Sequence, residues 1–444
     1  MTSPLIGCHS LFIDENMILD RSQSPDYQII KSVSLPPIHT VILGNGLPLH
    51  VINIGEQPVV KIECLFEAGS WYEKNAAESF FATKMLQEGT ATFTSSEISE
   101  RLEKLGAFIE LAHSTDKTGI VVYCLDRMLP RVLEVIQEMI FEATIPQKEL
   151  DELKNITLQH LKVNEEKVSW VAGNRFREEI FGYKHPYGRF QTETQITGLN
   201  ADNVRLFYEQ HLQRGPVCIF LSGKVGDKEI KAVEDVFGAR KMSGNVQNSP
   251  VIDTPAKTNP QTRTLVEKED SVQSAIRVGK EMFTRQHPDY FKMQVVNEIL
   301  GGYFGSRLMK NIREEKGLTY GISSMIYTFR HAGFLTIGTD VKREFTEQTI
   351  NEIFKEIRLL QEVAVSATEL QTVKNYMAGE FAGSLNTAFD IAEKRKILII
   401  ENLPEDFYEQ YINAIHATTA EEIMELSQKH LAVDDMKVVV CGGY

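Results

Sequence analysis

Residues of the types that can bind metal ions are scattered along this chain. A catalytic zinc site commonly takes two histidines from positions i and i+4 of one helix together with a third protein ligand. No His/Glu pairing has that spacing, and His113, His185, His211 and His331 stand singly. The five cysteines form no C-x-x-C pair, which is typical of reduced thiols. We therefore expect this chain to bind no metal.

A second group of chemically capable residues surrounds Arg313 and Tyr320. These two stand seven positions apart in the segment 311–320, which reads NIREEKGLTY. A charge run of this kind usually solvates one face of a helix, and Tyr320 would suit the core of a strand. On the residues alone we favour that structural interpretation over a functional one.

Composition and charge exclude several classes of protein. With 444 residues, the chain exceeds the size of one typical hydrophobic core, so we expect two or more domains. Its 42% hydrophobic and 24% charged residues are typical of a globular protein, and its net charge of −14 argues against a nucleic-acid partner. No segment predicts a membrane span or a secretory signal. We expect a cytoplasmic protein, or a periplasmic one if an upstream signal is missing.

The chain carries the same order of elements twice. Apolar alternation at 119–123 and 333–337 predicts two strands, which lead through Asp126 and Asp340 into amphipathic helices near 131–142 and 346–360. The next helices begin with Glu-Leu, 220 residues apart (369 − 149). Each copy closes with a helix, a buried strand and a glycine, at 208–223 and 427–442. Two similar domains are the simplest explanation.

The repeat and the turn signals divide the chain into four segments. Residues 242–260 are rich in Ser, Asn, Pro and Thr and predict a linker. We place the first domain at 38–241, the second at 261–444, and an N-terminal arm at 1–37. A strand pair at 40–53, turned at Asn45-Gly46, should open the first domain.

Several motifs resemble the pitrilysin and mitochondrial-processing-peptidase family, also called inverzincins. They are AGSWYE at 68–73, Gly89-Thr90 and HPYG at 185–188 in the first half, and GSRL at 305–308 and the segment 313–320 in the second. The similarity runs from about residue 40 to the C-terminus. It implies an α+β fold of two homologous domains, each an antiparallel-rich sheet with helices on one face, which enclose a chamber.

The zinc motif of that family is degenerate in this chain. Active relatives carry H-x-x-E-H on a helix just before Gly-Thr, with a distant Glu as the third ligand. The matching positions hold Phe80, Thr83 and Lys84, and His160 stands where the distant Glu belongs. Phe80 has no lone pair, Thr83 is no base near neutral pH, and Lys84 would bring a positive charge to the cation. We interpret the lone His160 as an ordinary helix histidine.

The signature of the second half is intact. In active relatives an Arg and a Tyr with this spacing reach across the chamber from the zinc-free domain. The resemblance implies that Tyr320 donates a hydrogen bond to the oxyanion and that Arg313 binds substrate oxygens. Gly301, Gly302 and Gly305 lie where the processing peptidase has a glycine-rich substrate loop. The loop is much shorter here, so a flexible connector is our default interpretation.

These observations predict the non-zinc-binding subunit of a heteromeric zinc metallopeptidase. A homologous partner with H-x-x-E-H would hold the zinc and the base, the substrate would be an unfolded peptide, and this chain would be inert alone. One alternative is an inactive structural or peptide-binding protein of the same fold, like the core proteins of the respiratory cytochrome bc complex. Another is an autonomous peptidase with a rebuilt metal site, which would require about one zinc per chain.

Overall fold

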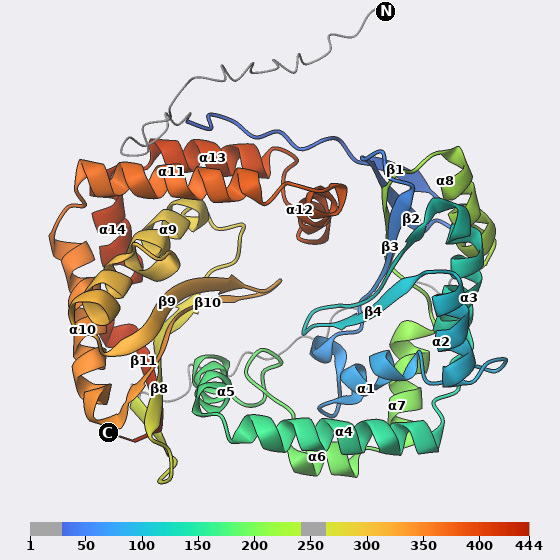
Figure 1. Ribbon diagram of the computed structural model, residues 1–444, viewed down its shortest axis with the longest axis horizontal. Coiled ribbons are helices and arrows are strands. Elements are labelled where there is room, and N and C mark those ends of the chain that lie inside the picture. The colour runs from blue at the N-terminus through green and yellow to red at the C-terminus, as the bar shows by residue number, and fades with distance from the viewer. Residues whose placement is uncertain (1–28, 241–262, 444) are drawn as a thin grey trace, which may run out of the picture.

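Two α+β halves lie side by side in the computed structural model of this chain (Figure 1). The structure describes residues 29–240 and 263–443. The predicted linker at 242–260 and residues 1–28 of the predicted arm lie outside the described residues. Within the described ranges, no helix is long and apolar enough to cross a membrane.

The first half is built on a six-stranded sheet in the order β1-β2-β6-β3-β5-β4. Its neighbouring strands are antiparallel except for the parallel pair β2 and β6. The predicted hairpin at Asn45-Gly46 is confirmed, and Gly46 has a φ of +88°, which glycine adopts without strain. The strands are β1 (His39–Ile42), β2 (Pro48–Asn53), β3 (Val59–Phe66), β4 (Phe108–His113), β5 (Thr118–Leu125) and β6 (Cys218–Gly223).

The second half repeats this sheet without the first hairpin strand. Its order is β7-β11-β8-β10-β9, and the chain order of the elements pairs β7, β8, β9, β10 and β11 with β2, β3, β4, β5 and β6. The closing strand β11 lies parallel to β7, as β6 lies parallel to β2 in the first half. The prediction of two homologous α+β domains is confirmed. The strands are β7 (Arg263–Glu267), β8 (Gln273–Met282), β9 (Thr319–Thr328), β10 (Gly333–Lys342) and β11 (Lys437–Gly442).

The helices follow the same repeat. The predicted pairs at 131–142 and 346–360, and at 149 and 369, are α3 with α10 and α4 with α11. The helices of the first half are α1 (Glu78–Met85), α2 (Ser95–Lys104), α3 (Leu129–Phe141), α4 (Gln147–Glu165), α5 (Val168–Phe181), α6 (Glu193–Gly198), α7 (Ala201–Phe207) and α8 (Asp227–Val233). Those of the second are α9 (Tyr290–Asn297), α10 (Thr346–Glu362), α11 (Ala367–Gly383), α12 (Ala388–Ile400), α13 (Phe407–Ala417) and α14 (Ala420–His430).

The two halves exchange one helix each. In β11, Val438 and Val440 pack into the core of the second half, while the alternate residues Val439 and Cys441 join the core of the first half. Successive side chains of a strand point to opposite faces, so this sheet is covered on both sides at β11. The covering helix on the second face is α5, which packs against β8 and β11 (Figure 1).

Helix α12 makes the reciprocal contact with β2 and β6 of the first sheet. Its Lys396 forms an ion pair with Glu63 of β3 at 2.8 Å, and the Glu63 side chain is only 5% exposed. Lys61 lies 3.4 Å from Glu63 and also contacts Glu393 of α12. Burial opposes the charge of Lys61, but Glu63 and Glu393 hold its pKa above the ordinary value. Because the halves share buried charges as well as apolar surface, they form one connected unit.

Candidate functional site

Tyr320 lies at the start of the edge strand of the second sheet. The predicted helix end near Gly317 is confirmed, because a π-helical segment, η6 (Met309–Glu315), stops there and Gly317 has a φ of +62°. Strand β9 then begins at Thr319, whose hydroxyl donates to the carbonyl of Asp340 at 2.8 Å and accepts from Thr339. The backbone is thus fixed, while the side chain of Tyr320 is 94% exposed.

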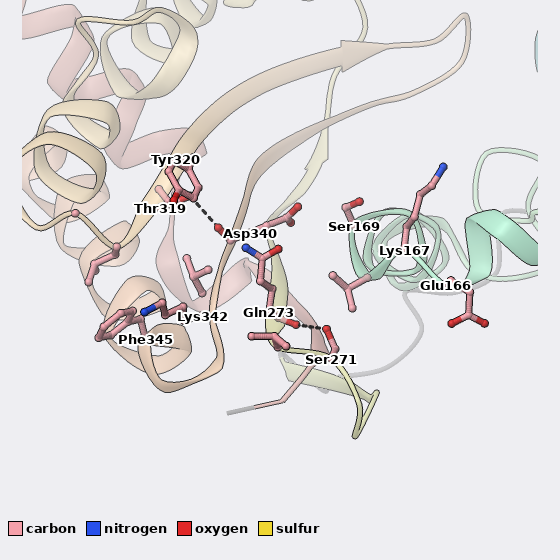
Figure 2. Close-up of a pocket in the computed structure, with 15 residues that line it drawn as sticks. Glu166, Lys167, Ser169, Ser271, Gln273, Thr319, Tyr320, Asp340, Lys342 and Phe345 are labelled. Carbon is pink, nitrogen blue, oxygen red and sulfur yellow. Dashed lines mark hydrogen bonds between the residues drawn. The ribbon is translucent and has the colours of Figure 1, made fainter.

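A cavity of about 820 Å³, the Tyr320 cavity, lies between the two halves (Figure 2). One wall is the end of the second sheet, with Tyr320, Gln273 of β8 and Lys342 of β10. The other wall is the connection between α4 and α5, with Lys167 and Ser169. Tyr320 also lines a neighbouring cavity of about 500 Å³ over the open face of β8, β9 and β10. Tyr320 therefore stands at the boundary of two cavities.

Arg313 lines neither of these cavities. Its guanidinium carbon lies 4.7 Å from the centre of the Phe304 ring, in a cation–π contact with a side chain that is itself 65% exposed. The expected pair of Arg313 and Tyr320 is therefore not brought together in either cavity.

The predicted glycine-rich connector is mostly helical. Gly301 and Gly302 end the π-helical segment η5 (Glu298–Gly302), which continues α9, and Gly305 lies in the turn that follows. A Cβ on Gly301 would lie 2.7 Å from the Cβ of Ser324 in β9. The interpretation as a flexible connector is wrong for Gly301, because this glycine lets a helix approach the strand that carries Tyr320.

The degenerate zinc-motif positions lie on α1 and do not fit a zinc ion. Thr83 is fully buried and its hydroxyl donates to the Ser79 carbonyl at 2.7 Å. The Lys84 ammonium donates to the carbonyl of Leu111 at 2.8 Å. Phe80 offers only a ring, which packs edge-on against another aromatic side chain. The helix is therefore held by structural contacts at the positions where ligands would stand.

Phe80 and His160 nevertheless line one cavity, of about 400 Å³, which we call the donor cavity. His160 comes from α4 and faces this space together with His113 of β4 and Glu73. Across residues 29–240 and 263–443, no three His, Cys, Asp or Glu side chains are placed to hold a metal ion. The structure thus brings two of the four motif positions, Phe80 and His160, into one cavity without forming a set of metal ligands among the described residues.

The sequence analysis missed a buried polar chain beside this cavity. The Glu73 carboxylate accepts from the Ser79 hydroxyl and pairs with Arg189 at 3.2 Å, and burial raises the pKa of Glu73. His113 Nε2 lies 2.6 Å from the Ser79 hydroxyl. Burial, together with the positive charge of Lys84, lowers the pKa of His113 to about 4. No spacing rule could find this chain, because its members come from a loop, a helix and a strand.

Comparisons with known proteins match both halves. Residues 51–185 match the family model described as insulinase (peptidase family M16), and residues 198–377 match the peptidase M16 inactive domain. A protein of Bacillus subtilis (strain 168) named uncharacterized zinc protease YmxG is 25% identical over 360 residues, which span 80% of this chain and 86% of that protein.

Solved structures share the fold. The peptidase M16 inactive domain from Pseudomonas fluorescens has a TM-score of 0.80 at 23% identity, over 92% of this chain and 98% of that one. The periplasmic protease PqqL from Escherichia coli has a TM-score of 0.76 at 15% identity, over 93% of this chain and 48% of that one. The present chain therefore matches about half of PqqL.

Proposed function

The chain belongs to the insulinase, or M16, peptidase family, and from this premise we propose that it is the zinc-free subunit of a two-chain zinc peptidase. One observation carries the proposal. The phenol of Tyr320 is exposed at the wall of a large cavity, whereas the positions of the two zinc-binding histidines and of the base in active relatives carry Phe80, Lys84 and Thr83. The chain thus keeps a phenol that can assist catalysis and lacks the zinc ligands and the base that activate the attacking water.

Tyr320 is well placed to act on a substrate brought by a partner. Within the described part of the chain its hydroxyl makes no hydrogen bond, so it is free to donate to the oxyanion that forms on a scissile carbonyl. The hydrogen bonds of Thr319 hold the strand beneath it, so the donor needs little reorganisation.

Arg313 would bind substrate by exchanging one partner for another. Its guanidinium lies over the Phe304 ring, in a contact worth about 0.5–1 kcal/mol at an exposed site. A substrate carbonyl or carboxylate would replace this contact with charge-assisted hydrogen bonds, which are stronger than hydrogen bonds between neutral groups. The cation–π contact therefore opposes substrate binding only weakly.

The partner would be a homologous chain with the H-x-x-E-H motif, which supplies the metal and the base. The fold match to about half of PqqL supports pairing of two such units. Unfolded peptide would enter the space between them, and Tyr320 lies on the exposed edge strand β9, where a second chain has access.

A second candidate is a non-catalytic structural or peptide-binding protein of the same fold. The match of residues 198–377 to an inactive M16 domain favours it. It would bind peptides without any cleaving partner, which separates it from the first proposal.

Purification of the tagged chain from its native host tests the proposal. We expect a stoichiometric M16 relative carrying H-x-x-E-H among the co-purifying proteins, identified by mass spectrometry. A homo-oligomer or an unrelated complex would contradict it and favour the non-catalytic role.

A further inference from the structure

The donor cavity of the first half has a chemistry of its own. It is an open cavity lined mainly by residues of α1, α4, α5 and the segment 186–191. Its volume of about 400 Å³ suits a small organic molecule or the last residue of a peptide. Among the described residues that line it, two arginines, Arg177 and Arg189, accompany a single carboxylate, Glu73.

Asn174 is an unsatisfied buried donor in this cavity. Its side chain is 9% exposed, and its Oδ1 accepts a hydrogen bond from Arg177 at 3.0 Å. Its Nδ2 has no partner among the described residues. A buried N–H group without an acceptor is costly and uncommon, so an acceptor in the cavity would stabilise it.

Arg177 carries a positive charge without an opposing carboxylate. Among the described residues it forms no ion pair, whereas Arg175 on the same helix pairs with Glu178 at 3.1 Å and Glu179 at 2.6 Å. Desolvation by burial lowers the pKa of Arg177. Of the described residues that line the cavity, Glu73 is the one carboxylate, and it is already paired with another arginine. The cavity therefore has room for one more negative charge.

Aromatic rings form part of the apolar lining. Trp170 and Phe190 meet edge to face with ring centres 6.2 Å apart, and Phe80 lines the same space. One zinc-ligand position of relatives, Phe80, thus presents an apolar ring to the same cavity as the Nδ2 of Asn174, which has no partner among the described residues. An anion held here would have its apolar substituent against these rings.

We propose that the donor cavity binds the carboxylate of an apolar amino acid at the C-terminus of a peptide. Arg177 and Asn174 stand three positions apart on one face of α5 and would share the two carboxylate oxygens. The terminal side chain would pack against Trp170 and Phe190. This site needs no partner chain and is independent of the role of Tyr320.

The purified chain allows a direct optical test, because it contains two tryptophans and only Trp170 lines the cavity. N-acetylphenylalanine should change the tryptophan fluorescence in a saturable way. Trp170→Phe should remove that signal while calorimetry still detects binding. N-acetylphenylalaninamide, which lacks the charge, should bind about 10-fold more weakly or worse. Gly-Gly-Phe binding at least as tightly as the acetylated amino acid would identify a peptide end as the source.

Matched variants separate the site from general damage. Arg177→Gln should weaken N-acetylphenylalanine about 10-fold or more, while Arg175→Gln should leave it unchanged. If Arg177→Gln fails to fold, the comparison of acid and amide on the unmodified chain still decides. Equal binding of acid and amide, no saturable binding by any probe, or equally tight binding of inorganic phosphate would overturn the proposal.

Discussion

Replacement of Tyr320 by phenylalanine should remove catalysis without removing the fold. The side chain is 94% exposed and its hydroxyl makes no hydrogen bond within the described residues, so stability should change by less than about 0.5 kcal/mol. Loss of one oxyanion donor commonly costs about 2.7–4 kcal/mol, or about 10²–10³ in kcat. The two magnitudes differ enough for activity and stability to be separated.

The assay uses the complex of this chain with its zinc-bearing partner and a quenched fluorescent peptide. We expect kcat to fall about 10²-fold or more with little change in KM, because the hydrogen bond forms only in the transition state. Tyr183→Phe is the matched control, since Tyr183 is 65% exposed in the first half and lines none of the cavities described above. Wild-type kcat for Tyr320→Phe, in a complex that assembles normally, would refute the assignment.

Two further predictions concern the stability of the fold. Gly301→Ala should destabilise the chain by about 1–3 kcal/mol in urea unfolding, because its Cβ would overlap Ser324 of β9. Gly379→Ala, in open space on α11, should stabilise the chain by up to about 1 kcal/mol. Equal effects of the two substitutions would contradict the close approach of Gly301 to β9. His113 stays neutral in the folded chain down to about pH 4, while in the unfolded chain it takes up a proton near pH 6.5. Its contribution to the free energy of unfolding is therefore fully present above pH 6.5 and is lost as the pH falls toward 4, by about 3 kcal/mol at most. His113→Gln should flatten this pH dependence relative to the unmodified chain, and an unchanged profile would exclude His113 as its source.

The repeat could be predicted because its signals are local. Apolar alternation marks strands such as β5 and β10, and helical spacing marks α3 and α10, whatever they pack against. The order of these signals along the chain then predicts the same sheet twice. The degenerate motif could be placed by counting from Gly89-Thr90, and α1 does carry these residues.

The exchange of α5 and α12 could not be predicted from the sequence. An apolar stripe shows that a helix is buried but not which sheet covers it. The buried ion pair of Lys396 with Glu63 joins residues 333 positions apart, and a local pattern cannot connect charges over that separation. The donor cavity could not be predicted either. Asn174 and Arg177 have ordinary helical spacing, and only the folded structure shows that they line one cavity.

Reconstitution from two purified chains tests the central claim most directly. This chain and an M16 relative with H-x-x-E-H from the same host would be assayed alone and mixed, and their zinc content measured. We expect no cleavage by this chain alone, strong cleavage by the mixture, and zinc carried only by the relative. Cleavage by this chain alone with about one zinc bound, or a mixture no more active than the relative by itself, would contradict the account.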